Sequence, residues 1–168
     1  MTTKATVALM ARYNQWQNAS LYTAAGTLDD AERRKDRGAF FGSIHGTLCH
    51  LLWGDTFWMS LFAGWERSPL GLPESPGLIA EWETLVTQRR EADAGIIAWS
   101  DGVSETWLAG DVTWYSGLRQ ADVTRPAALC VTHFFNHQTH HRGQVHAMLT
   151  AAGATPEDTD LVAMPHLD

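Results

Sequence analysis

The stretch from residue 39 to residue 63 constrains the fold most, because it is apolar on nearly every side and contains no proline. A helix of that composition must be covered on most sides, so we expect it to be the central helix of a bundle. It carries His45, His50 and Asp55, none of which can be buried cheaply without a partner. Because apolar residues surround the helix, its pattern alone does not show which of the three faces a functional site.

Three further segments have helical periodicity and complete an expected bundle of four helices. They cover residues 3–25, 78–99 and 128–152, and the last is expected to end at Gly153. A length of 168 residues with 45% hydrophobic content suits one domain with a real core. The sequence therefore predicts an all-α protein, a single four-helix-bundle domain over residues 1–168.

The segments between these helices lack a helical period. Residues 28–38 are charged and are expected to form a solvated loop in which Asp29 or Asp30 caps a short turn. Residues 64–77 hold three of the six prolines and predict a long crossing loop. Residues 102–127 predict a small β excursion between the third and fourth helices, either a short irregular hairpin or an extended segment. The final residues, EDTDLVAMPHLD, are expected to lie extended against the bundle.

Composition excludes several classes of function. A formal net charge of -7 argues against a nucleic-acid partner, because phosphate binding needs a basic face. No segment reaches the roughly 18 uninterrupted apolar residues of a membrane span, and the start has no apolar run typical of a signal peptide. We therefore expect a cytoplasmic protein with no membrane partner. Cys49 and Cys130 are lone cysteines in apolar surroundings and are interpreted as small buried hydrophobes.

Histidines are concentrated on the expected helix over residues 128–152. Its core stripe recurs at spacings of three and four residues and comprises Cys130, Phe134, His137, His141, Val145, Met148 and Ala152. His137 and His141 lie one turn apart on this stripe, so their imidazoles can converge and form half of a metal site. His133 and His137 have the same spacing and form a competing pair. The alternative without a metal is a pair of core histidines hydrogen-bonded to the backbone or to Asp55.

A third ligand must come from another helix, because one helix face cannot surround a metal ion. The candidates are His45, His50 and Asp55. Three neutral imidazoles with one open position suit Zn²⁺, Ni²⁺, Fe²⁺ or Co²⁺, and such an ion activates a water or holds a thiolate or carbonyl group. On the helix over residues 3–25, Asn14 falls on the inward stripe, where it either satisfies a core hydrogen bond or lines a site.

Three motifs together resemble a known family. They are HxxxHRGQ from His137 to Gln144, the helical segment TLCHLLWGD and the N-terminal YNQWQN. The chain is similar over nearly its whole length to the DinB/YfiT-like metalloenzymes. This resemblance implies a four-helix bundle with a long overhand connection, a divalent metal held by three histidines, and a homodimer. Carried over by position, the ligands are His50, His137 and His141, and His45 has no counterpart in the motif.

Two functions follow as hypotheses. The first is an enzyme with one divalent metal, zinc or nickel before iron or cobalt, that acts on a small molecule as a hydrolase or as a transferase using a low-molecular-weight thiol. Asn14, Asp55, Arg142 and Gln144 are the candidates for supporting the ligands or orienting the substrate. The second is a non-catalytic, homodimeric metal-binding bundle with a structural or stress-related role. An open fourth coordination position favours the first, and a fourth ligand such as Asp55 or His45 favours the second.

Overall fold

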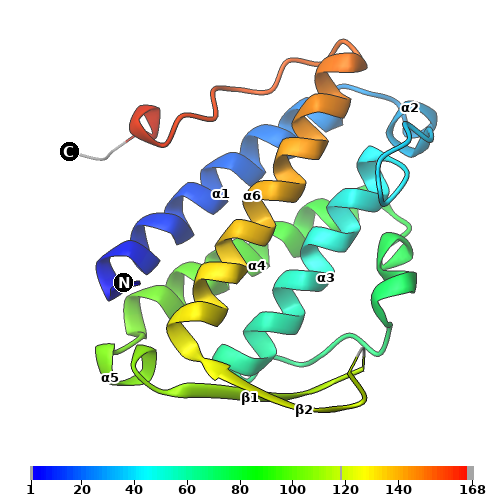
Figure 1. Ribbon diagram of the computed structural model, residues 1–168. Helices are drawn as coiled ribbons and strands as arrows, with labels where there is room; N and C mark the ends of the chain where they lie inside the picture. Colours follow the sequence, from blue (N-terminus) through cyan, green and yellow to red (C-terminus); the bar gives the residue numbers. More distant parts are fainter. Residues whose placement is uncertain (1, 118, 166–168) are drawn as a thin grey trace.

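Four long helices form a bundle in the computed structural model, which describes residues 2–117 and 119–165 (Figure 1). The helices are α1 (Lys4–Gly26), α3 (Ile44–Ala63), α4 (Trp82–Gly102) and α6 (Ala127–Ala151). α1 packs against α4 and α6, and α3 packs against the same two helices. The predicted all-α bundle is confirmed, with boundaries displaced by a few residues. Among the described residues, no helix is long and apolar enough to cross a membrane.

The central helix is α3, as its composition predicts, and its apolar side chains enter both parts of the core. Leu48 and Leu52 pack with residues of α1 and α6 in one cluster, whereas Met59 and Phe62 belong to a second cluster nearer the hairpin. The helix begins at Ile44 rather than at residue 39. Ser43 caps it by accepting a hydrogen bond from the Gly46 amide, and residues 39–42 form a tight turn instead.

The charged segment over residues 28–38 is more ordered than a solvated loop. It contains the short helix α2 (Asp30–Arg34), and Asp29 caps this helix through the Glu32 amide. Arg33 is buried, and its guanidinium lies 4.6 Å from the centre of the Trp82 ring. The expected cap by Asp29 is present, but the expectation of a solvated loop was wrong for Arg33, because the apolar stem and planar head of an arginine can cover an aromatic ring.

The connection from α3 to α4 returns along the side of α3. Gly64 ends α3 in the left-handed conformation with φ of 71°, and the 3-10 helix η1 (Leu72–Gly77) packs against α3. The Trp53 indole donates to the Leu70 carbonyl over 2.8 Å, which ties this loop to the helix. The predicted crossing loop thus covers one face of α3, and it brings the buried Ser75 against that helix.

The predicted hairpin is present at one end of the bundle. After the short helix α5 (Glu105–Leu108), strands β1 (Asp111–Ser116) and β2 (Ala121–Pro126) pair antiparallel, with Trp114 opposite Val123. Two strands have little stability alone, and here they are supported by contacts with α3 and α6.

The C-terminal segment runs beside α1, as expected. Tyr13 donates to the Thr159 carbonyl over 2.7 Å and Gln17 donates to the Asp158 carbonyl over 2.8 Å. A short 3-10 helix, η2 (Leu161–Ala163), follows, and the last three residues of the sequence lie outside the described part of the chain.

Candidate metal centre

Packing of α3 against α6 brings three histidines together: His50, His137 and His141, called here the histidine trio. Each offers a ring nitrogen, and these nitrogens all lie within 4.8 Å of one another. The Nε2 atoms of His50 and His137 are 3.1 Å apart. Two nitrogens bound to one tetrahedral ion at about 2.1 Å would be about 3.4 Å apart, so this spacing is close to that of a metal centre.

Local sequence explains why the rings can converge. His137 and His141 stand one turn apart on α6, as their spacing requires, and their ring centroids are 4.5 Å apart. Facing them on α3 is Gly54, where a Cβ atom would lie only 3.0 Å from Cε1 of His137. The glycine therefore leaves the space that the His137 ring occupies between the two helices.

Hydrogen bonds to the Nδ1 atoms of His50 and His141 determine which ring nitrogen keeps a lone pair for a metal. Ser75 uses its proton to donate to the Leu72 carbonyl over 2.8 Å, so its oxygen accepts from Nδ1–H of His50 at 2.9 Å. Gln144 accepts from Nδ1–H of His141 at 2.8 Å through its side-chain oxygen. These partners, from which the tautomers are assigned, leave Nε2 of both histidines without a proton and available to a ligand.

The facing ring nitrogens of the trio are arranged to bind a positive ion. With Nε2 of His50 unprotonated, the facing Nε2 of His137 at 3.1 Å must either carry a proton or share a positive ion with it. Burial and the neighbouring imidazoles lower the pKa of His50 to about 3 and that of His137 to about 4, and burial also lowers the pKa of His141. All three rings are therefore neutral near pH 7, which is the form that binds a metal.

Comparison with known proteins agrees with this geometry. The DinB family matches over residues 1–168. This chain belongs to the DinB family. It is 26% identical over 155 residues to Protein DinB of Bacillus subtilis (strain 168), across 88% of this chain and 87% of that protein. No solved structure matches the chain. The family that HxxxHRGQ indicated is thereby confirmed.

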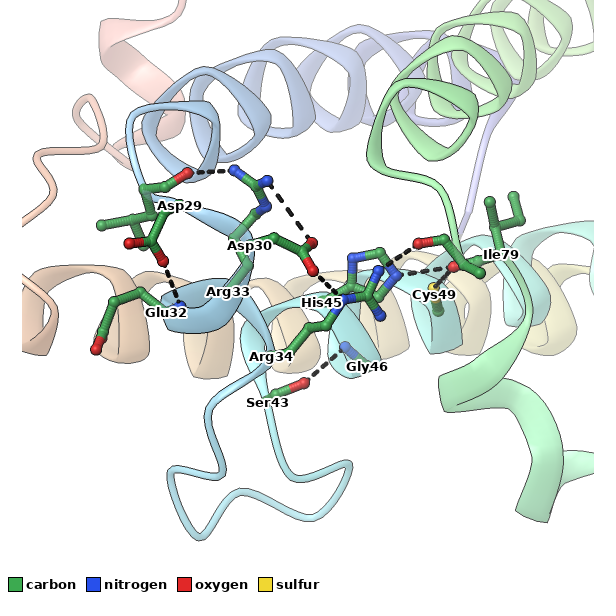
Figure 2. A network of polar contacts seen from close by, with 12 residues as sticks. Asp29, Asp30, Glu32, Arg33, Arg34, Ser43, His45, Gly46, Cys49 and Ile79 are labelled. Atoms are coloured by element: carbon green, nitrogen blue, oxygen red, sulfur yellow. Dashed lines mark hydrogen bonds and ion pairs between the residues drawn. The ribbon is translucent and has the colours of Figure 1, made fainter.

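His45, the other histidine of α3 weighed as a ligand, has a different position in this DinB family member. Its Nε2 lies 2.8 Å from the Ile79 carbonyl, which also accepts a bond from Cys49 at 3.4 Å. Figure 2 shows His45 and Cys49 meeting Ile79 in the segment that leads into α4, next to Arg34 of α2. His45 thus joins α3 to the end of the crossing loop, and it does not belong to the trio.

His133, the other competitor on α6, lies outside the converging nitrogens. It is exposed, its ring centroid is 5.9 Å from that of His137, and it makes a T-shaped contact with Trp58 at a centroid distance of 5.2 Å. Among the described residues, the group able to hold a metal contains His137 and His141 but not His133.

Asp55 is buried, and both of its oxygens are engaged away from the trio. Arg89 donates to Oδ2 at 2.5 Å, and Gln138 donates to Oδ1 at 2.8 Å. Arg89 also forms an ion pair with Asp93 at 2.9 Å. Neither histidine of the α6 pair is hydrogen-bonded to Asp55 in the described part of the chain, so the interpretation of that pair as core histidines held by Asp55 has no support.

Asn14 and Arg142 belong to the same interior network. Arg142 donates to the side-chain oxygen of Asn14 and, over 3.3 Å, to Thr139. The Asn14 amide donates to Asp93 over 3.3 Å. Of the four residues expected to support the ligands, Gln144 is thus the one whose side chain bonds a trio histidine within the described structure.

Two contributors to the site and its surroundings were missed by sequence reasoning. Ser75 lies in a loop without a period, and nothing in the sequence links it to His50, which precedes it by 25 residues. Arg89 did give a signal, because a charged residue on the inward stripe of α4 requires a buried partner.

A groove of about 960 Å³ lies elsewhere, between α1 and α4, and the described residues that line it include Trp16, Tyr22 and Val86 but no histidine. Cavity volume therefore does not identify the histidine trio, which is identified by its converging ring nitrogens.

Proposed function

We propose that this protein is an enzyme that uses one divalent metal ion, held by His50, His137 and His141, to act on a small molecule. The observation that carries the proposal is the convergence of three neutral imidazoles, two of which have their outer nitrogens engaged by Ser75 and Gln144. Supported ligands of this kind are typical of functional metal sites. The reaction class that suits them is transfer to or from a low-molecular-weight thiol, or hydrolysis.

A bound divalent ion supplies Lewis acidity, which lowers the pKa of a water or thiol and polarises a carbonyl group. Ser75 and Gln144 hold the tautomers of His50 and His141. The Phe41 ring stacks on His50 and excludes water from one side of that imidazole. Three imidazoles suit zinc or nickel first, and iron or cobalt also accept this donor set.

The competing proposal is a non-catalytic bundle whose metal has a structural role. A structural site has four protein ligands, whereas a catalytic one keeps a position open. His45 and Asp55, the two candidates for a fourth ligand, are bonded to Ile79 and to Arg89 with Gln138, respectively. Because both side chains are bonded elsewhere, neither supplies a fourth ligand, and this favours a catalytic site over a structural one.

The experiment is elemental analysis of protein made without an affinity tag, followed by a screen for thiol transfer and hydrolysis. We expect about one metal ion per chain in the wild type, its loss in His50→Ala, and its retention in the control His146→Ala on α6. A wild type that folds normally without metal would refute both proposals. Metal retained at full occupancy by His50→Ala would move the site elsewhere.

We also propose a homodimer, on the strength of the resemblance to DinB/YfiT-like proteins. Light scattering after gel filtration tests it, and a monomeric mass at micromolar concentration would contradict it.

A further inference from the structure

Aromatic rings surround the histidine trio, beginning with the turn before α3. Phe41 stacks on His50 with ring centroids 3.6 Å apart and planes 19° apart, and its centroid is 5.3 Å from that of His141. Phe40 meets the edge of Phe41 at 4.8 Å and is 81% exposed. Phe40 is thus separated from the trio by the Phe41 ring, and its exposed surface is apolar area that a ligand bound at the trio can contact.

The turn that carries these two rings is rigidly placed. Gly38 and Gly42 have φ angles of 70° and 75°, which other residues adopt at a cost, and the Arg37 amide donates to the Gly42 carbonyl. A Cβ atom on Gly46 would lie 2.5 Å from the Phe41 carbonyl oxygen, so the glycine lets the turn rest directly on α3. Phe40 is thus exposed on a turn that packs directly against α3.

A second set of rings leads away from the trio along α3. Trp53 stacks on His50 at 5.8 Å, Phe57 stacks on Trp53 at 6.0 Å, and Trp58 meets the edge of Phe57 at 5.4 Å. Trp58 then contacts His133 on α6, whose ring is next to His137. These partly exposed rings form an aromatic band between the trio and the hairpin, on the helices that lie side by side in Figure 1.

Charge is sparse along this aromatic band (Trp53, Phe57, Trp58). Arg67 places its guanidinium 4.8 Å from the centre of the Phe57 ring, and it is the one cation stacked on the band within the described residues. Around the trio itself, the polar partners are the neutral groups of Ser75 and Gln144. Surroundings made of aromatic rings and neutral polar groups favour a ligand with a flat apolar part over one that is strongly charged or heavily hydroxylated.

We propose that the substrate of this site carries an aromatic or conjugated group, which packs against Phe40 and the aromatic band while another atom of the substrate binds at the trio. The inference rests on the proposed metal centre and adds the class of substrate. Phe40 acts as a specificity-determining residue, since its ring contacts the apolar part of the substrate and is not needed by the fold.

The test compares two ligands of the Co²⁺-loaded protein, imidazole and 4-phenylimidazole, through changes in the visible spectrum. We expect the wild type to bind the phenyl compound about 10-fold more tightly than imidazole, since the added ring buries apolar surface. Phe40→Ala should reduce that preference by about 3- to 10-fold, the value of one aromatic contact. Phe57→Ala should reduce it as well, and cobalt content should not change. The control Val162→Ala removes another highly exposed apolar side chain and should have no effect.

The outcomes separate the two proposals. Wild-type protein that holds no cobalt would refute the metal centre itself. Protein that holds cobalt yet binds both compounds equally, or binds neither, would overturn the aromatic substrate while leaving the metal centre in place. An unchanged preference in both Phe40→Ala and Phe57→Ala would overturn it too.

Discussion

Gly54→Ala is the sharpest perturbation of the candidate metal centre, because it adds one methyl group and removes no polar atom. The new Cβ would lie 3.0 Å from Cε1 and 3.5 Å from Nδ1 of His137. Ordinary carbon contacts are about 3.5–4.0 Å, so the half-buried imidazole must move by several tenths of an ångström. Metal–ligand distances tolerate only about 0.2 Å of deviation, so the displaced His137 would be a poorer ligand beside the other two histidines.

Two opposing effects act on the stability of the metal-free protein, and a separate effect acts on its metal affinity. Alanine is favoured over glycine inside a helix by about 1 kcal/mol, which stabilises the metal-free protein. The clash with His137 offsets part of this gain. Disturbing the support of a ligand costs about 10- to 100-fold in metal affinity, which is about 1.4–2.7 kcal/mol. Gly54→Ala is therefore expected to bind metal about 10- to 100-fold more weakly, with the stability of the metal-free form nearly unchanged.

Gly143→Ala is the matched control. Gly143 lies inside α6 beside Arg142, and a Cβ there would meet nothing within 4 Å. This variant should gain about 1 kcal/mol in the free energy of unfolding and keep its metal affinity. The assay is competition with a chromophoric chelator for Zn²⁺, together with urea denaturation of the metal-free proteins. Metal affinity within about twofold of the wild type in Gly54→Ala would refute the argument that His137 is a ligand in the position described.

Three further predictions follow from the surroundings of the trio. Ser75→Ala removes the acceptor that holds Nδ1–H of His50, and it should lower metal affinity by about 10-fold, measured by the same competition. In metal-free protein, the lowered pKa values of His50 and His137 mean that the folded state binds fewer protons than the unfolded state below about pH 6.5. The free energy of unfolding should therefore be constant above that pH and fall below it, by up to about 1.4 kcal/mol per pH unit for each histidine. Equal free energies of unfolding at pH 7.5 and pH 5, measured by urea denaturation, would contradict this. Arg89→Met leaves two buried aspartates without their cation and should cost about 3–5 kcal/mol in urea denaturation, whereas the same change at the exposed neighbour Arg90 should cost little.

Properties that depend on neighbouring residues in the chain could be read from the sequence. The spacing of His137 and His141 is fixed by the helix itself, and their place on the core stripe favoured this pair, although His133 and His137 have the same spacing. The all-round apolar character of α3 in the same way predicted its central position. Gly54 lies on the same helix and faces His137, whose ring occupies the space that a side chain would fill.

Contacts between distant segments were not predictable in this way. Asn14 and Arg142 were expected near the ligands because both are polar residues on or beside inward faces. The structure pairs them with each other in the interior, and Asn14 also bonds Asp93, because a buried arginine and a buried carboxylate each need several partners. Ser75 had no signal, since a loop of prolines and glycines has no period that would place it against α3.

The sequence by itself determined the helices, the pair of histidines on α6 and, through its motifs, membership of the DinB family. The helical pattern of α3 left its rotation open, and the motif resemblance implied His50 as the ligand without a physical reason. Only the tertiary structure shows the rotation itself: His50 faces α6, whereas His45 faces Ile79 in the segment before α4. The physical reason is that a helix apolar on all sides can be buried equally well in several orientations, so packing against its neighbours has to choose between them.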